Sequence, residues 1–248
     1  HQVVLKPNAL KIEKEENANT VNIDEEDKLI TLSTEKVKVS LSKESGLLCE
    51  YIVNNKNILK EELKPYFWRS STNNDRGFKN EINAVSWRNP EMNLVNIKTE
   101  NYSKLVNLIV DIELDNGSTV TYIYSLDNNS KFKVQQILNP NRDLSIIPAI
   151  SDMFMLKEEF KYITYYGRGE IENYWDKYKS AKIGLYNDIV SDEMVNYLQP
   201  QENGAKTDVR YLEIKNENGE GIKISGVPTF EFNISKYHPE DVEVADHF

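Results

Sequence analysis

Residues 108–124 have the sequence Leu108-Ile109-Val110-Asp111-Ile112-Glu113-Leu114-Asp115-Asn116-Gly117-Ser118-Thr119-Val120-Thr121-Tyr122-Ile123-Tyr124. Polar and apolar positions alternate on both sides of the central Asn116-Gly117 pair. Because successive side chains of a strand point to opposite faces, this alternation predicts two strands that share one buried face. Asn-Gly favours a tight hairpin turn, since both residues tolerate a positive φ. The stretch therefore predicts an antiparallel β-hairpin.

The same pattern recurs along the chain. Residues 212–224 contain a second alternating pair of segments around Asn218-Gly219, and further turns are predicted at 54–57 and 127–129. From about Leu29 onward the sequence predicts one all-β domain of many short antiparallel strands, either a sandwich or a barrel. Helical patterns are few: one or two turns at 156–162, and a short helix at 238–245 that begins with a proline.

Composition excludes several classes of function. The 248 residues include 30 Lys and Arg against 40 Asp and Glu, a formal charge of −10, which argues against binding to nucleic acid. No apolar run approaches the ~20 residues of a membrane-spanning helix. The single Cys49 excludes an internal disulfide, and His1, His238 and His247 are too scattered for a zinc site. We therefore expect no metal and no cofactor in this chain.

The chain begins with a charged segment and without a methionine. Residues 11–28 carry many charges and little periodicity, so we expect residues 1–24 to be a linker or the end of a preceding domain. Residues 25–248 are expected to form the sandwich, truncated at its C-terminal end. The character of both ends leads us to expect a fragment of a longer protein; the alternative is a mature protein that has been trimmed normally.

Three segments interrupt the strand pattern, and the first spans residues 66–78. Its aromatic side chains, two arginines and Asn-Asp pairs suit a platform for sugar rings; alternatively, it is a strand end that enters a capped loop, with Arg69 paired to Asp75. The run Tyr66-Phe67-Trp68, together with Trp87, is also a candidate for an exposed apolar patch that docks another domain.

The second segment spans residues 165–176 and the third residues 197–204. Glycines on both sides of Arg168 predict a tight backbone path that turns the guanidinium inward. Glu170 and Glu172, two apart on a strand, would lie about 6.6 Å apart, near the lower limit for an inverting glycosidase pair; alternatively, both are solvated or paired acids. The third segment predicts a structured loop, followed by a possible Asp208–Arg210 salt bridge.

Taken in order, the three segments resemble the C-terminal β-sandwich of bacterial β-galactosidases of glycoside hydrolase family 2, also called the small chain or fifth domain. The family patterns are Trp-Arg-Ala-Pro-Thr-Asp-Asn-Asp-x-Gly, Tyr-Gly-Arg-Gly-Pro-x-Glu-Asn-Tyr and Pro-Gln-Glu-Asn-Gly. They correspond to Trp68–Gly77, Tyr166–Tyr174 and Pro200–Gly204. The first departs from the pattern at Ser70, Ser71 and Asn73, and the second at Glu170, where the family has Pro.

The resemblance implies an antiparallel β-supersandwich similar to galactose mutarotase. It also implies that the catalytic glutamates lie in a separate barrel domain, so no catalytic residue is expected here, Glu170 included. The candidates for the rim of the substrate site are Trp68, Arg69, Asn74, Asp75, Gly77 and Phe78. The residues of the structural motifs are Gly167, Arg168, Gly169, Glu172, Asn173, Tyr174, Pro200, Gln201, Glu202, Asn203 and Gly204.

The implied function is that of an accessory domain, inactive alone, which supports the catalytic barrel of an enzyme that hydrolyses terminal β-D-galactosides. Its expected partners are the barrel, the other domains and the galactoside, and its compartment would be bacterial, cytoplasmic or periplasmic. Two alternatives remain open. One is a free-standing mutarotase-like enzyme that uses His238 and His247, and the other is a carbohydrate-binding sandwich.

Overall fold

A computed structural model describes residues 20–190 and 197–245. Its first sheet has the strand order β1-β2-β3-β4-β6-β11, with β5 paired to β4. All of its paired strands are antiparallel. The strands of this sheet are β1 (Asn22–Glu25), β2 (Leu29–Ser33), β3 (Val37–Ser42), β4 (Leu48–Val53), β5 (Lys56–Asn57), β6 (Leu59–Tyr66) and β11 (Ser151–Leu156).

The second sheet has the order β10-β9-β8-β7 and contains the predicted hairpin. Its strands are β7 (Met92–Tyr102), β8 (Leu105–Leu114), β9 (Thr119–Asp127) and β10 (Phe132–Asn139). Val110 pairs with Tyr122 across β8 and β9, and Gly117 in the turn has a φ of +79°. The hairpin prediction is confirmed.

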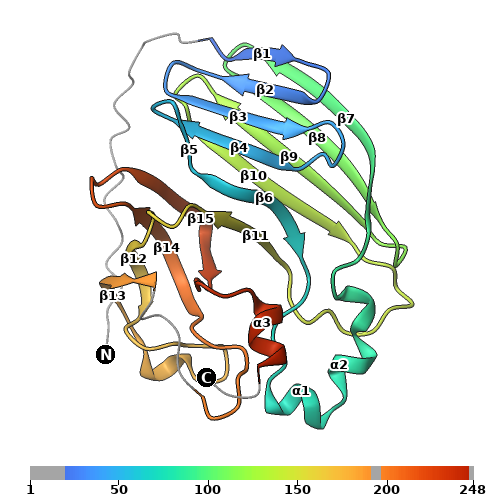
Figure 1. Cartoon of the computed structure of the whole chain (residues 1–248), viewed down its shortest axis with the longest axis vertical. Helices are drawn as coiled ribbons and strands as arrows, with labels where there is room; N and C mark the ends of the chain where they lie inside the picture. Colours follow the sequence, from blue (N-terminus) through green and yellow to red (C-terminus); the bar gives the residue numbers. More distant parts are fainter. Residues whose placement is uncertain (1–19, 191–196, 246–248) are drawn as a thin grey trace.

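The first two sheets pack face to face (Figure 1). Alternate residues of β8 and β9 point into the space between them, where Val110, Ile112 and Tyr122 are fully buried against Leu32 and Leu41 of the first sheet. Burial of one large apolar side chain contributes about 1.5–3 kcal/mol. This interior holds the sandwich together, and the predicted all-β antiparallel sandwich is confirmed.

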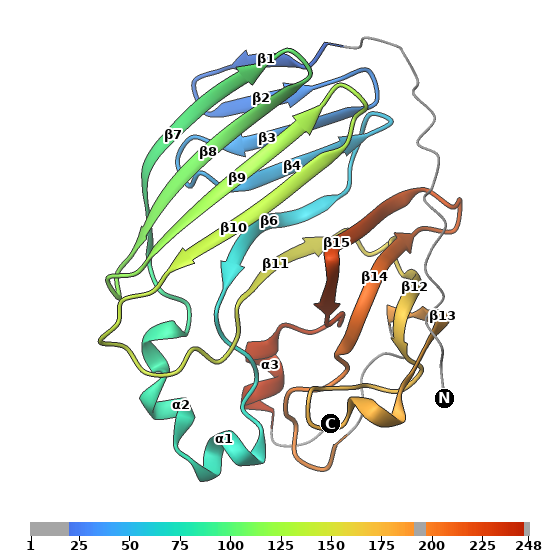
Figure 2. The same ribbon diagram turned by 180° about the vertical axis from the view of Figure 1, so that it is seen from behind.

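A third sheet, of order β13-β12-β14-β15, lies beside the sandwich (Figure 2). Its strands are β12 (Tyr162–Gly169), β13 (Lys182–Ile189), β14 (Lys206–Lys215) and β15 (Gly221–Phe232). The hairpin of β14 and β15 turns at Gly219, as its Asn-Gly pair predicts. Ile163, Leu212 and Ile214 form a smaller core with Ile58, which lies between β5 and β6. The third sheet is thereby attached to the first.

Short helices lie between the strands and after the last one. They are α1 (Asn73–Gly77), α2 (Asn80–Asn83), the 3₁₀ helices η1 (Val85–Trp87) and η2 (Tyr178–Ser180), and α3 (Pro239–Val244). The helix predicted at 238–245 is confirmed by α3. The helical turns predicted at 156–162 are wrong, because that segment links β11 to β12 and both strands pair with distant partners. Within residues 20–190 and 197–245, no helix has the length and apolar character needed to cross a membrane.

The sheet begins slightly earlier than the sequence indicated. Residues 22–25 form strand β1 and pair with residues 30–33, so residues 22–24 are part of the first sheet. All four residues of β1 are exposed, so the strand has no apolar face that a sequence pattern could reveal. Residues 1–19 lie outside the described part of the chain, and the proposed division into two domains stays a prediction.

Candidate functional site

The three motif segments meet at one end of the molecule, near α1, α3 and the loops on either side of β13 (Figure 1). The Arg76 guanidinium donates a hydrogen bond to the backbone oxygen of Pro200 at 3.3 Å, and the Asn73 amide donates to the side chain of Gln201 at 3.4 Å. The Asn173 amide donates to the backbone oxygen of Ala205 at 2.8 Å. We call this meeting of segments 66–78, 165–176 and 197–205 the motif junction.

Glu172 is the buried acid of the junction. Its carboxylate accepts hydrogen bonds from the backbone amide of Gly204 at 2.8 Å, from Lys177 Nζ and from the Tyr197 hydroxyl. Burial opposes ionisation, but these three donors outweigh it and lower the pKa of the Glu172 carboxyl. The carboxylate therefore acts as an internal acceptor that joins the second segment to the third.

The amide nitrogen and oxygen of the Asn173 side chain form all their hydrogen bonds within the junction. Its amide nitrogen donates to the backbone oxygens of Arg168 and Ile171, both at 3.0 Å, and its amide oxygen accepts from the backbone amide and hydroxyl of Thr207. The residue is fully buried. Neighbouring Tyr174 is largely buried, and this burial raises the pKa of its hydroxyl. Buried amides need such a full set of partners, so Asn173 fixes the course of the chain after β12.

Arg168 points inward, as predicted. Its Nε and Nη2 atoms lie 2.9 and 2.8 Å from one carboxylate oxygen of Asp208, and Nη1 donates to the backbone oxygen of Ala181 at 2.9 Å. The guanidinium also stacks over the Tyr178 ring at 5.0 Å. The possible Asp208–Arg210 salt bridge is not formed; Arg210 instead donates to the backbone oxygen of Asp208.

The glycines beside Arg168 are required by packing. A Cβ atom on Gly167 would lie 2.9 Å from Val209 Cα, a backbone atom of the neighbouring strand β14. A Cβ atom on Gly169 would collide with the Tyr165 hydroxyl and meet the Tyr186 ring at 3.0 Å. Strand β12 ends at Gly169, so the expectation that Glu170 and Glu172 share one strand face is wrong: Glu170 is exposed, and Glu172 is buried.

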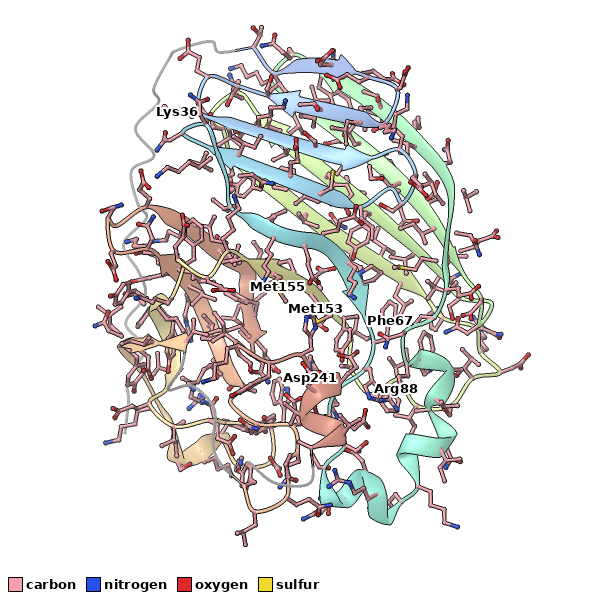
Figure 3. All side chains as sticks on the ribbon, in the orientation of Figure 1. Lys36, Phe67, Arg88, Met153, Met155 and Asp241 are labelled. Atoms are coloured by element: carbon pink, nitrogen blue, oxygen red, sulfur yellow. The ribbon has the colours of Figure 1, made fainter. Side chains whose placement is uncertain are left out.

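The aromatic run of the first segment lies in the core. Tyr66, Phe67, Trp68 and Trp87 are all buried, so the prediction that they form an exposed docking patch is wrong. Trp68 Nε1 donates to Glu243 of α3 at 3.2 Å, and Arg88 pairs with the same carboxylate at 2.8 Å. Figure 3 shows Arg88 extending toward α3. Trp68 therefore anchors α3 from below the surface.

Arg69 and Asp75 pair as the capped-loop alternative predicts, at 2.9 Å. Asp75 also accepts from the Thr72 amide at 2.9 Å, while the Thr72 hydroxyl accepts from the Asp75 amide, forming a capping box at the start of α1. Of the other rim candidates, Asn74, Gly77 and Phe78 are exposed. Among the rim candidates, Trp68 is therefore buried, whereas Asn74, Gly77 and Phe78, in and directly after α1, are exposed.

The third segment binds loops together. Asn203 Nδ2 donates to the backbone oxygen of Gln201 at 2.8 Å, and Asn233 Nδ2 donates to Glu202 and to the backbone oxygen of Asn203, both at 2.7 Å. Burial raises the pKa of Glu202, although the Asn233 hydrogen bond opposes this shift. Pro200 and Gln201 receive the bonds from α1 described above.

The described part of the chain contains no group of histidines or acids that could form a catalytic pair or a metal site like those considered from the sequence. His238 lies at the start of α3, with Nε2 4.0 Å from Glu61, and His247 lies outside the described residues. Within the described ranges, no three His, Cys, Asp or Glu side chains are grouped so that they could hold a metal ion. Sequence reasoning missed the contributions of Lys177, Tyr197 and Glu243. The partners of Tyr197 and Glu243 are distant along the chain, whereas Lys177 pairs with Glu172, five residues away.

Comparison with known proteins decides the family. The family model described as Beta galactosidase small chain matches residues 33–248. The chain belongs to the β-galactosidase small-chain family. The resemblance based on the three motifs is thereby confirmed.

Relatives of the small-chain family are much longer than this chain. A β-galactosidase of Priestia megaterium is 33% identical over 231 residues, which cover 92% of this chain and 22% of the relative. Those of Halalkalibacterium halodurans and Streptococcus thermophilus are 26% and 27% identical, covering 95% and 92% of this chain and 24% and 23% of the relatives. The chain therefore spans less than a quarter of the length of these bacterial relatives.

Proposed function

We propose that the chain is a non-catalytic accessory domain of a β-galactosidase that hydrolyses terminal β-D-galactosides. It supports the catalytic barrel and shapes the rim of the sugar site, and it is inactive alone. Membership of the small-chain family supports this role, as do relatives named β-galactosidase that are over four times longer than the matched segment. Its partners are the remaining domains of the parent enzyme and, at the rim, the galactoside.

The observation that carries the proposal is the bonding of Glu172. Glycoside hydrolysis uses two carboxyl groups that flank the scissile bond, one of them able to exchange a proton with the substrate. Glu172 is buried and engaged by Gly204, Lys177 and Tyr197, and its pKa is lowered, the opposite of what a general acid needs. We therefore assign the catalytic carboxyl groups to the rest of the parent enzyme, and we expect no cofactor in this chain.

The rim role is assigned to α1. Its capping box and the Arg76–Pro200 hydrogen bond hold the short helix in place, while Asn74, Gly77 and Phe78 face outward. An exposed amide and an aromatic ring can respectively hydrogen-bond and stack on a sugar. Arg69 supports this helix through its pair with Asp75, and Trp68 lies buried next to it in sequence, bonded to α3.

Hydrolysis of a chromogenic β-galactoside by the purified 248-residue chain tests the proposal. We expect no release of product above the uncatalysed background. Clear turnover that disappears in the Glu172→Gln variant would overturn the proposal, because it would place the chemistry within this chain.

A further inference from the structure

The chain contains three Asn-Gly pairs, at residues 116–117, 203–204 and 218–219. An asparagine side chain loses ammonia most readily when glycine follows it, because glycine has no Cβ atom to shield its amide nitrogen. The three pairs share this intrinsic reactivity, so their surroundings in the fold decide which of them reacts.

Deamidation of such a pair needs only water. The glycine amide nitrogen gives its proton to solvent and attacks the side-chain Cγ of the preceding asparagine. The new N–Cγ bond closes a cyclic imide, the Cγ–Nδ2 bond breaks, and the nitrogen leaves as ammonia after taking up a proton from solvent. Water then adds to either carbonyl of the imide and opens it to aspartate or isoaspartate. Since the asparagine side chain must turn toward the following amide, hydrogen bonds that hold the side chain oppose the reaction.

Two of the pairs occupy the same position in equivalent β-turns. Between β8 and β9 the Gly117 amide donates to the backbone oxygen of Leu114 at 2.9 Å, and between β14 and β15 the Gly219 amide donates to that of Asn216 at 3.0 Å. The φ angles of the two glycines are +79° and +77°. The backbone is therefore the same at both pairs, and only the side-chain contacts differ.

The Asn116 side chain is held at both of its polar atoms. Its Nδ2 donates to the backbone oxygen of Ser86 at 2.9 Å, and its Oδ1 accepts from the Ser118 amide at 3.0 Å. The Asn141 side chain also lies against this turn, since a Cβ atom on Gly117 would be 3.0 Å from its Nδ2. Movement of Asn116 toward the Gly117 amide would break both of its hydrogen bonds.

The pair Asn203-Gly204 is held at both reacting groups. Asn203 is only 5% exposed, and its Nδ2 donates to the backbone oxygen of Gln201 at 2.8 Å. The Gly204 amide, which would be the attacking group, donates to the Glu172 carboxylate at 2.8 Å. This amide cannot attack Asn203 while it binds the carboxylate.

Asn218 lacks this protection. Both Asn218 and Gly219 are exposed, and apart from the chain neighbours no described heavy atom would lie within 4 Å of a Cβ added to Gly219. Within residues 20–190 and 197–245, the side-chain amide of Asn218 forms no hydrogen bond, and its backbone amide donates to Asn216 Oδ1 at 3.0 Å. Only the bond between the Gly219 amide and Asn216 has to open before attack, and bonds in exposed turns open at little cost.

We propose that Asn218 is a site of spontaneous deamidation, where the folded protein acquires aspartate and isoaspartate with time. The inference is independent of the proposed function. Either product adds a negative charge to a turn that already carries Glu217 and Glu220, which pair with Lys161 and Lys56, each at 3.0 Å. Isoaspartate also adds a methylene group to the backbone of the turn, so we expect it to weaken the pairing of Glu220 with Lys56 of β5.

Mass spectrometry of the folded full-length polypeptide, incubated in mildly alkaline buffer, tests all three pairs in one sample. A lysine-specific protease cuts after Lys215 and Lys223 and releases residues 216–223, which include Asn218 and neither of the other pairs. We expect the mass gain of about 1 Da, and the isoaspartate labelled by a protein isoaspartyl methyltransferase, at Asn218. Its rate should exceed those at Asn116 and Asn203 by about tenfold or more, because these two must first break side-chain hydrogen bonds.

Two controls complete the experiment. In urea-unfolded protein the three pairs should convert at similar rates, because their local sequence is the same. Asn218→Gln should remove the signal from the 216–223 peptide, since glutamine forms the corresponding imide far more slowly. Equal rates at Asn218 and Asn116 in the folded protein would overturn the inference, as would a signal that persists in Asn218→Gln.

Discussion

The carboxylate of Glu172 accepts a hydrogen bond at 2.8 Å from the backbone amide of Gly204, the last residue of the Pro-Gln-Glu-Asn-Gly motif. The two residues are separated by 32 positions, so this bond joins the second motif segment to the third. Gly204 has a φ of +84°, a conformation that glycine adopts without strain. The bond explains physically why a glutamate and a glycine stand at these two positions.

Glu172 makes the stability of the domain depend on pH. Its folded-state pKa is lowered below the ordinary value of 4.5, so its contribution is complete above that value and is lost as the pH falls through the folded pKa. We expect the free energy of unfolding to fall more steeply below about pH 4.5 in the wild type than in Glu172→Gln. Urea unfolding at a series of pH values measures this, and parallel curves for the two proteins would refute it.

Arg168 stabilises the junction through the shape of its guanidinium. In Arg168→Lys the two bonds to Asp208 and the bond to Ala181 cannot all form, so we expect a loss of about 1–3 kcal/mol in the free energy of unfolding. Arg142→Lys, at an exposed position, is the control and should change stability by less than about 0.5 kcal/mol. Equal effects of the two substitutions in urea unfolding would argue against the role of Arg168.

Tyr122 and Tyr124 form a matched pair in the sandwich core. Both rings are fully buried and stack at 5.1 Å. The Tyr122 hydroxyl donates to Asp152 at 2.6 Å, whereas within the described ranges the Tyr124 hydroxyl makes no hydrogen bond of good geometry and only approaches the backbone of Leu48. We expect Tyr122→Phe to cost about 1–2 kcal/mol and Tyr124→Phe to be neutral or stabilising. Thermal unfolding of both variants measures the difference, and a larger loss in Tyr124→Phe would contradict it.

Substitution of Gly167 tests the packing of the Gly-Arg-Gly motif, with Gly77 of α1 as the control position. Gly167→Ala places a methyl group against the backbone of Val209, so we expect a loss of about 1–3 kcal/mol. Apart from its chain neighbours and the backbone of α1, no described heavy atom lies within 4 Å of a Cβ added to Gly77, and Gly77→Ala should leave stability unchanged or raise it by up to about 1 kcal/mol. Chemical denaturation compares them; if Gly167→Ala were as stable as the wild type, the close approach of β12 and β14 would be disproved.

Local patterns predicted the parts of the fold that depend on neighbouring residues. The hairpins at Gly117 and Gly219 and the helix that begins at Pro239 follow from turn chemistry and alternation. The Arg69–Asp75 pair was one of two alternatives for its segment. Helix α1 also had a sequence signal that the capped-loop alternative did not use, the Thr72-x-x-Asp75 spacing of a capping box.

The remaining features depend on contacts between residues that are far apart in the sequence, and local patterns do not reveal these contacts. Nothing in the sequence around residues 156–162 shows that β11 pairs with β6 and β12 with β14, pairings that override the weak helical pattern. Likewise, an aromatic run such as Tyr66–Trp68 suits either a surface or a core, and the acids of α3 that bind Tyr66 and Trp68 lie far along the chain. The bonds of Glu172 to Tyr197 and Gly204 could not be predicted for the same reason.

The most direct test of the account is the pH dependence of kcat for β-galactoside hydrolysis by the full-length parent enzyme, with and without Glu172→Gln. Circular dichroism must first show that both proteins are folded at the assay temperature. Because Glu172 holds loops and exchanges no proton with substrate, we predict that both limbs of the pH profile are retained and that kcat stays within about threefold of the wild-type value. Loss of one limb, with a fall in kcat of about 10³-fold in the folded variant, would contradict the account.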